Sequence, residues 1–230
     1  MGSLLPGAQD AVGLVVVIDV FRCFTTEAVA FENGAKEIVL VAEIEEAFDL
    51  QKQGRGDLLM GEVGGKKPQG FDFGNSPYTY INTDYADKEI VLTTTNGTKA
   101  LDIAKNAETV LVGSLINIDS LNNLLSNKKS NVLCLCSGWQ SKFNLEDTIC
   151  AGAIVDFLIS TGNFTSIEDS SIAAKYLYLS AKDNYLGYLK SSSHRRRLIN
   201  LNLNEDIKYC LTPNQTDVIP ILKDGKIIKL

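Results

Sequence analysis

Val12-Gly13-Leu14-Val15-Val16-Val17-Ile18-Asp19-Val20-Phe21-Arg22 is a run of apolar, mostly β-branched residues that ends in an acid and an arginine. Successive β-branched residues, Val15 to Ile18, are typical of a central strand that is buried on both faces. The run is too short to cross a membrane, because a spanning helix needs about 20 apolar residues. We therefore expect an inner strand of a sheet here, with Asp19 at its carboxyl end.

Shorter apolar runs follow along the chain, and each ends in a polar or glycine-rich turn. The predicted strands are Val12–Ile18, Glu37–Val41, Asp57–Met60, Glu89–Leu92, Thr109–Val112, Asn131–Leu135 and Asp217–Leu222. Stretches with helical periodicity lie between them, and the predicted helices are Phe24–Glu32, Ile44–Gln53, Thr98–Lys105, Asp119–Asn127, Leu145–Ile159 and Ile172–Leu189. Strands that alternate with helices indicate an α/β fold with a largely parallel sheet.

Two segments interrupt this alternation. Gly61–Pro77 is rich in glycine and proline, and Ser191–Arg197 is a short polar and basic stretch. Loops of this length inside a compact domain tend to be functional. Without a repeat or a linker, we expect a single α/β domain over residues 1–230, with a less regular C-terminal lobe from about Ser160.

The composition is that of an ordinary globular protein. The 230 residues include 22 Lys and Arg against 28 Asp and Glu, which gives a formal net charge of −6. Nucleic acids and anionic membranes require a positive footprint, so we expect neither as a partner. The five cysteines show no C-x-x-C spacing, and no signal peptide is evident. Reduced, buried thiols in a cytoplasmic protein are the expectation.

Polar residues recur after the predicted strands, where ligands of open α/β sheets bind. Thr93-Thr94-Thr95-Asn96-Gly97 is the most suggestive case, because a hydroxyl-rich turn leads directly into a helix. Free backbone N–H groups and the helix dipole make such a turn an anion site. The alternative is that Thr95 or Asn96 only caps the helix.

Acids gather at two of these places. Asp19 is either a metal ligand, a nucleophile, or the partner of Arg22 in a structural ion pair. Glu146 and Asp147 follow Asn144 at the start of a long apolar helix. They either suit the helix dipole behind an Asn144 cap, or complete with Asp19 a set of oxygen ligands for Mg²⁺.

His194 is the only histidine and precedes Arg195, Arg196 and Arg197. An arginine run is usually a solvated face, but here it supplies three of the few basic charges, so anion binding is the competing interpretation. Trp139 either lines a pocket or packs in the core or on the surface.

Several motifs of phosphate chemistry are absent from the sequence. It contains no phosphate-binding G-x-x-x-x-G-K-[ST] loop, no G-x-G-x-x-G and no G-x-S-x-G. The second acid of aspartyl-phosphate phosphatases would fall at Phe21, and the arginine of cysteine-dependent phosphatases at Lys142. If phosphate is hydrolysed, metal-activated water is favoured over Asp19 as the nucleophile.

Short motifs spread over almost the whole chain resemble the 2-phosphosulfolactate phosphatase family. They are Val17–Arg22, Asn33–Ala35, Gly61–Gly65, Gly70–Pro77, Leu92–Thr98, Val112–Ser114, Phe143–Thr148, Ala151–Ala153 and Ser193–Arg196. The resemblance implies a three-layer α/β/α arrangement with a parallel or mixed sheet. It also implies a Mg²⁺-dependent phosphatase that converts 2-phospho-3-sulfolactate to sulfolactate and phosphate, a step of coenzyme M biosynthesis.

Three places depart from the family pattern. Val63 stands where many members have arginine, and Phe24 stands where threonine is frequent. Ser137–Gln140 replaces a sequence that in other members is similar to Ala-Gly-Thr-Asp. A lost arginine and the bulky Trp139 near the expected pocket would alter recognition of the organic part of the substrate.

From residue chemistry we assign roles to these positions. Asp19 and Glu146, with Asp147, are the expected Mg²⁺ ligands, and the turn from Thr93 to Gly97 is expected to hold the phosphate. Arg22 and Lys66 are expected to offset the charge of the transition state, and Asn75, Ser76 and Ser114 to complete the polar wall of the site. His194 and Arg195 are expected to bind the sulfonate or carboxylate, or to donate a proton. Because the net charge repels such a substrate, these basic groups must gather near Asp19.

Other functions stay open at this point. The same loops would serve a non-catalytic protein that binds phosphorylated metabolites, or a phosphatase for another small phosphorylated 2-hydroxy acid. A small anionic phosphorylated substrate is the expected partner in each case. A homodimer is a fair expectation for an enzyme of this size.

Overall fold

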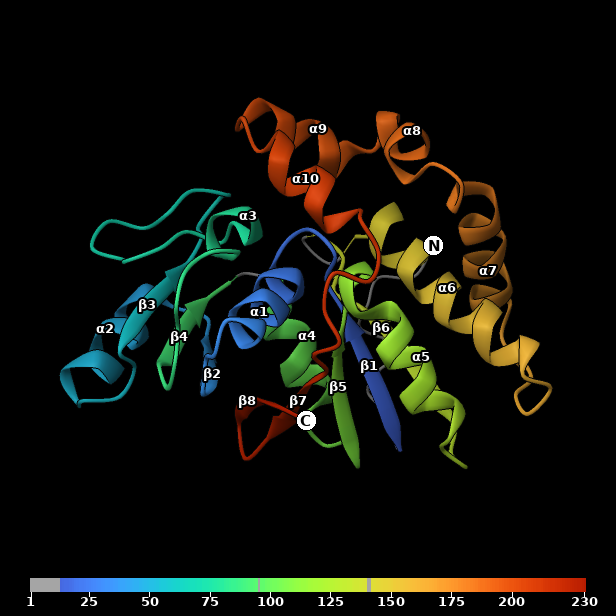
Figure 1. Ribbon diagram of the computed structural model, residues 1–230, viewed down its shortest axis with the longest axis horizontal. Helices are drawn as coiled ribbons and strands as arrows, with labels where there is room; N and C mark the ends of the chain where they lie inside the picture. Colours follow the sequence, from blue (N-terminus) through green and yellow to red (C-terminus); the bar gives the residue numbers. More distant parts are fainter. Residues whose placement is uncertain (1–12, 95, 140–141) are drawn as a thin grey trace.

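The computed structural model describes residues 13–94, 96–139 and 142–230, and its arrangement is shown in Figure 1. In this part of the chain, one eight-stranded sheet has the strand order β3-β4-β2-β8-β7-β5-β1-β6. The strands are β1 (Leu14–Ile18), β2 (Glu37–Val41), β3 (Leu58–Gly61), β4 (Glu89–Thr93), β5 (Thr109–Gly113), β6 (Val132–Cys136), β7 (Pro220–Lys223) and β8 (Lys226–Lys229). Helices cover both faces, so the expected α/β/α arrangement with a mixed sheet is confirmed.

The helices alternate with the strands in the first two thirds of the chain and then follow one another. They are α1 (Cys23–Glu32), α2 (Ile44–Lys52), α3 (Pro77–Tyr80), α4 (Gly97–Ala104), α5 (Ile118–Ser126), α6 (Leu145–Ser160), α7 (Asp169–Ala181), α8 (Tyr185–Tyr188), α9 (Ser193–Asn200) and α10 (Asn204–Cys210). Short 3₁₀ turns, η1 (Leu115–Asn117) and η2 (Leu189–Ser191), complete the set.

β1 is the inner strand that the sequence predicts. It pairs in parallel with β5 on one side and β6 on the other, and all five of its residues are buried. Val15 and Val17 belong to the core on the side of α1 and α4, whereas Val16 and Ile18 belong to the core on the side of α5 and α6. Because side chains alternate along a strand, both faces of β1 are apolar and the run has no polar position.

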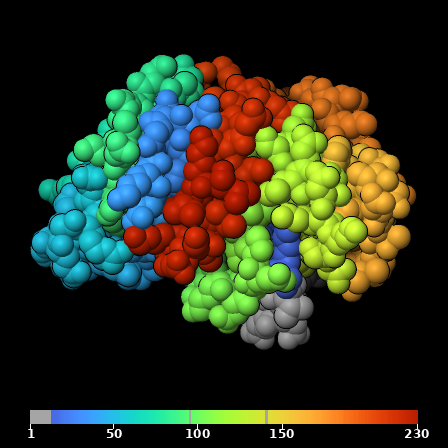
Figure 2. All heavy atoms as spheres, turned by 60° about the horizontal axis from the view of Figure 1, so that its bottom comes forward, coloured from blue at the N-terminus to red at the C-terminus, as the bar shows by residue number. Residues whose placement is uncertain are grey.

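The C-terminal hairpin β7–β8 lies between two parallel blocks, β3-β4-β2 and β5-β1-β6. It contacts each block through one antiparallel pair, Ile38 with Ile227 and Leu111 with Ile221. Figure 2 shows the C-terminal segment in red between the blue segment around α1 and the yellow-green segment around α5. Helix α1 is buried along nearly its whole length, and its polar residues Thr25, Thr26 and Glu27 are buried with the rest.

Some predicted elements differ from those of the structure. The predicted helix Ile172–Leu189 is divided into α7, α8 and η2, and α10 and β8 have no predicted counterpart. The expectation of a loop at Ser191–Arg197 is wrong, because α9 begins at Ser193, and Ser192 Oγ accepts a hydrogen bond from the Arg195 amide at 3.3 Å. Figure 1 shows α8, α9 and α10 crossing the end of the sheet where β1 leads into α1.

No helix in the described ranges is long and apolar enough to cross a membrane. The cysteines are all free. The single-domain interpretation, including the less regular lobe, stays a prediction.

Candidate active site

Asp19 lies directly after β1, and only 5% of the residue is exposed. Burial raises its pKa well above the ordinary value for an aspartate, and the neighbouring Asp147 raises it further. Hydrogen bonds from the Ser137 side chain and the Cys23 backbone lower this pKa in part. None of the ion pairs found among the described residues includes Asp19. Asp19 is thus a buried acid without a cationic partner.

The cationic partner expected for Asp19, Arg22, instead pairs with Asp206. Arg22 Nη1 lies 3.2 Å from Asp206 Oδ2, and both residues are buried. Asp206 Oδ1 accepts a hydrogen bond of 2.6 Å from Ser76 Oγ. The Arg22 guanidinium also donates to the Gly65 carbonyl at 3.4 Å. The structural alternative of an Asp19–Arg22 ion pair is therefore wrong, and α10 supplies the acid that positions Arg22.

Asp147 is buried and accepts hydrogen bonds at both carboxylate oxygens. Its donors are Val20 N at 2.9 Å, Ser137 Oγ at 3.2 Å, Gly138 N at 3.0 Å and Asn144 Nδ2 at 2.8 Å. Burial and the adjacent Glu146 raise the pKa of Asp147 to about 7. Asn144 occupies the N-cap position of α6 as expected, but its side chain makes no cap hydrogen bond. Asp147 therefore connects the loops after β1 and β6 with the start of α6.

Glu146 is completely buried and contacts His194 on α9. Glu146 Oε1 lies 2.6 Å from His194 Nδ1, and Glu146 Oε2 has no hydrogen-bond partner among the residues that the structure describes. The His194 ring packs edge-on against Phe21, with 5.6 Å between the ring centroids. Because Glu146 contacts Nδ1, Nε2 is the ring nitrogen with which His194 can contact a ligand.

A cleft of about 200 Å³ is lined by Asp19, Arg22 and His194, whereas Glu146, Asp147 and Asp206 are not among its lining residues. Predicted site residues that line it are Asp19, Arg22, Asn75, Thr94, Asn96 and His194. They come from the carboxyl ends of β1 and β4, the loop after β3, and α9. Loops that are far apart in the sequence thus meet at one site, as the recurrence of polar residues after strands predicts.

The other predicted binding residues lie outside this lining. Lys66 is exposed in a turn where it pairs with the Val63 backbone, and Arg195 Nη1 donates to the Leu186 carbonyl at 2.5 Å. Thr93 and Ser114 are buried at the ends of β4 and β5, and Ser76 is hydrogen-bonded to Asp206. Thr95 falls outside the described residues.

Gly97 does not line the cleft either but permits a close contact beside it. It is the first residue of α4, and a Cβ atom there would lie 2.9 Å from Cys23 Sγ. Such a separation is too short for two unbonded heavy atoms. Glycine at this position therefore allows the turn after β4, which the sequence predicts to bind an anion, to approach the start of α1.

Further residues complete the site, and for Trp139 and Arg197 the sequence had left a place at the pocket and a packed or solvated position open. Trp139 and Arg197 line the cleft, as does Glu62, which accepts a hydrogen bond from the Gly65 amide. Glu27, in α1, is fully buried; burial raises its pKa well above the ordinary value, and the nearby Asp19 raises it further. In the sequence, Glu27 is an acid within a mostly apolar helical segment, and this position could have indicated a buried acid.

The acidic groups fit a magnesium ion held by two carboxylates better than one held by three. In the described ranges, no three His, Cys, Asp or Glu side chains form a metal-binding group. Mg²⁺ commonly uses one or two carboxylates together with substrate phosphate and water. Glu146 Oε2 is buried without a partner, and Asp19 is buried without a cation, so these two acids suit a cation. The oxygens of Asp147 are already occupied.

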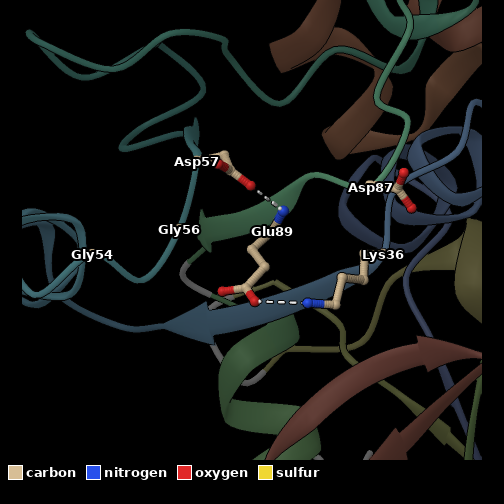
Figure 3. A pocket seen from close by; sticks show the side chains of 6 residues that line it. All are labelled: Lys36, Gly54, Gly56, Asp57, Asp87 and Glu89. Atoms are coloured by element: carbon tan, nitrogen blue, oxygen red, sulfur yellow. Dashed lines mark hydrogen bonds and ion pairs between the residues drawn. The ribbon is translucent and has the colours of Figure 1, made fainter.

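A second hollow, of about 300 Å³, lies at the opposite edge of the sheet. Figure 3 shows Lys36 facing Glu89 and Asp57 facing the Glu89 backbone. Lys36 Nζ lies 3.1 Å from Glu89 Oε1, and the Asp57 carboxylate accepts a hydrogen bond from the Glu89 backbone N–H at 2.8 Å. It contains neither a buried acid without a partner nor a free imidazole among its lining residues. The cleft at Asp19 is therefore the better candidate for chemistry.

The fold and the cleft define an α/β enzyme whose buried acids, imidazole and arginines surround a space for a small anionic substrate. The family model described as 2-phosphosulpholactate phosphatase matches residues 3–225, so the chain belongs to this family and is a phosphatase, a phosphoric monoester hydrolase.

Curated relatives agree with this assignment. A probable 2-phosphosulfolactate phosphatase of Caldanaerobacter subterraneus subsp. tengcongensis is 40% identical over 92% of this chain and 88% of its own. Proteins of the same name from Gloeothece citriformis and Thermotoga petrophila are 38% and 37% identical, covering 98% and 93% of this chain and 95% and 90% of their own.

Proposed function

We propose that this protein hydrolyses the phosphoester of 2-phospho-3-sulfolactate to sulfolactate and phosphate in a Mg²⁺-dependent reaction. The names of the relatives support the substrate. The observation that carries the proposal is the Glu146–His194 pair beside Asp19, because the His194 imidazole and the buried Asp19 carboxyl line one cleft and Glu146 contacts that imidazole. Supply of sulfolactate to coenzyme M biosynthesis, a cytoplasmic location and a homodimer stay predictions.

Asp19 and Glu146 Oε2 are the proposed ligands of the magnesium ion. The raised pKa of Asp19 supports this assignment, because a nearby cation would favour the ionised carboxylate. When bound, Mg²⁺ would supply charge neutralisation for the phosphate and a more acidic water.

The phosphate is proposed to lie against Thr94, Asn96 and the N-terminus of α4. Thr94 and Asn96 line the cleft, and the first N–H groups of a helix point toward an anion at its N-terminus. Arg22 would stabilise charge that develops on the phosphoryl oxygens. Asp206 pairs with the Arg22 side chain and so fixes its position at the cleft.

His194 is proposed to donate a proton from Nε2 to the alkoxide oxygen of the leaving sulfolactate. Glu146 fixes the orientation of the imidazole through Nδ1. Phe21 packs against the ring and restricts its rotation.

Phosphate release from 2-phospho-3-sulfolactate, with Mg²⁺ and after chelation by EDTA, tests this function. We expect turnover with Mg²⁺ and its loss on chelation. Phosphoglycerate and serine phosphate serve as comparison substrates, and both should react more slowly. Equal rates on all three esters, or undiminished turnover in EDTA, would contradict the substrate or the metal respectively.

A further inference from the structure

Helix α9 presents one face to the cleft. His194, Arg197, Leu198 and Leu201 all line it, and their spacing of three, four and seven residues puts them on one side of the helix and the turn that follows. Side chains three residues apart on a helix have Cβ atoms roughly 5–6 Å from each other. Arg197 therefore lies beside the imidazole proposed as the proton donor.

Arg197 differs from the other arginine of the cleft in its partners. Arg22 is held by Asp206, whereas no carboxylate pairs with Arg197 in the described part of the chain. Arg197 Nη2 is buried and, within the described residues, has no hydrogen-bond partner. A buried charged donor without a partner costs free energy, which a bound anion would recover.

The Arg197 guanidinium is stacked on Trp139, with 3.6 Å from its central carbon to the ring centroid. The Trp139 backbone is fixed on both sides. It exchanges hydrogen bonds with Lys142 at 3.0 and 2.9 Å, and the preceding amide, Gly138 N, donates to Asp147. Stacking on an aromatic face leaves the edge of a guanidinium free for a bidentate contact with an oxyanion.

We propose that Arg197, held against Trp139, binds the anionic group of the substrate that does not react. This inference rests on the proposed function, since it requires a substrate with a second oxyanion. In 2-phospho-3-sulfolactate, the carboxylate and the sulfonate are attached one and two carbons from the leaving oxygen. An arginine one helical turn from His194 reaches such a group while the imidazole contacts that oxygen. Arg197 is thereby a specificity-determining residue.

The test compares Arg197→Met with Arg196→Met, an exposed arginine at the next position of the same helix. Kinetics are measured on the full substrate, on 2-phospholactate, which lacks the sulfonate, and on O-phosphoisethionate, which lacks the carboxylate. We expect Arg197→Met to lower kcat/KM for the full substrate roughly 10- to 100-fold, mainly through KM. Arg196→Met should stay near the wild type, and Arg197→Lys should recover part of the loss.

The truncated substrates identify the group that is bound. If Arg197 holds the sulfonate, the substitution has little effect on 2-phospholactate but a large one on O-phosphoisethionate; the opposite pattern assigns the carboxylate. Equal losses on all three substrates, or equal behaviour of Arg197→Met and Arg196→Met, would overturn the proposal.

Binding of sulfolactate separates this proposal from the proposed function. Trp139 is the only tryptophan of the chain, so its fluorescence reports on the cleft directly. Sulfolactate should change the fluorescence and raise the Tm of the wild type and of Arg196→Met, but not of Arg197→Met. Sulfolactate binding without phosphate release would contradict the proposed function but support the role of Arg197 in binding. Binding that persists in Arg197→Met would contradict only the role of Arg197.

Discussion

His194 Nδ1 and Glu146 Oε1 lie 2.6 Å apart although 48 positions separate the two residues in the sequence. The contact joins α9 to the start of α6, and the Glu146 side chain at its inner end is completely buried. A buried carboxylate fixes the orientation and tautomer of an imidazole and leaves Nε2 for the substrate. The two residues should therefore behave as one catalytic unit.

Glu146→Gln should lower kcat by at least roughly two to four orders of magnitude, because it removes both the partner of His194 and a proposed magnesium ligand. His194→Asn should cause a smaller loss, because it leaves that ligand in place, and the double variant should be scarcely slower than Glu146→Gln alone, since residues of one unit are not additive. Phosphate release measures all three. Asp156→Asn, an acid on the same helix that pairs with Lys175 at 3.2 Å, is the control and should stay active. If the losses in the double variant were additive, Glu146 and His194 would not act as one catalytic unit.

Asp19→Asn should nearly abolish turnover while the protein stays folded. The amide has the same shape but cannot hold a cation, so addition of Mg²⁺ should raise the Tm of the wild type and not of the variant. Circular dichroism and the Mg²⁺-dependent Tm check these outcomes. Asp87→Asn is a matched control, because Asp87 is exposed at the opposite edge of the sheet (Figure 3) and asparagine tolerates its φ of 61°. Activity of Asp19→Asn near the wild-type level would exclude Asp19 as a ligand.

Asp206→Asn should destabilise the protein by about 3–5 kcal/mol, because it leaves the buried Arg22 without its counter-charge. It should also lower kcat, since Arg22 loses the partner that positions it. Arg22→Met alone should be destabilising for the same reason, and the double variant should be more stable than the sum of the single effects predicts. Urea unfolding of the four proteins gives the coupling free energy. A coupling near zero would mean that the pair does not position Arg22.

Much of the fold was predictable because it depends on local patterns. The buried run of β1, its pairing as an inner strand and the acid at its end all follow from residues that are adjacent in the sequence. The same holds for the polar turn after β4. Such patterns record which side chains a strand buries and which residues follow it, and these features do not require knowledge of distant parts of the chain.

The rest of the site depends on contacts between distant elements. Asp206 looks like any acid in the first turn of a helix, and only the packing of α10 brings it to Arg22. The sequence also left open whether the arginine run is solvated or binds an anion. In the structure Arg197 lines the cleft, whereas Arg195 donates to the Leu186 carbonyl. The expected concentration of basic groups near Asp19 is therefore met by Arg22, His194 and Arg197, and not by Lys66.

Glu27→Gln should change the pH dependence of stability. Burial raises the pKa of Glu27 well above its unfolded value of about 4.3, so folding favours the protonated carboxyl. The stability that Glu27 contributes is then fully present below that unfolded value and is lost as the pH rises toward the folded pKa. Glutamine does not titrate, so the Tm of the variant should match the wild type near pH 4 and exceed it increasingly at higher pH.

Thermal unfolding between pH 4 and pH 8 measures this difference, and about 1 kcal/mol corresponds to roughly 2–4 °C in a chain of this size. Glu45→Gln is the control for the loss of an acidic side chain, because Glu45 is an exposed acid on α2. A Tm difference for Glu27→Gln that falls or reverses as the pH rises would mean that Glu27 is ionised in the folded protein. In that case a cation, and not the Cys23 thiol that donates to Oε1 at 3.4 Å, would be its principal partner.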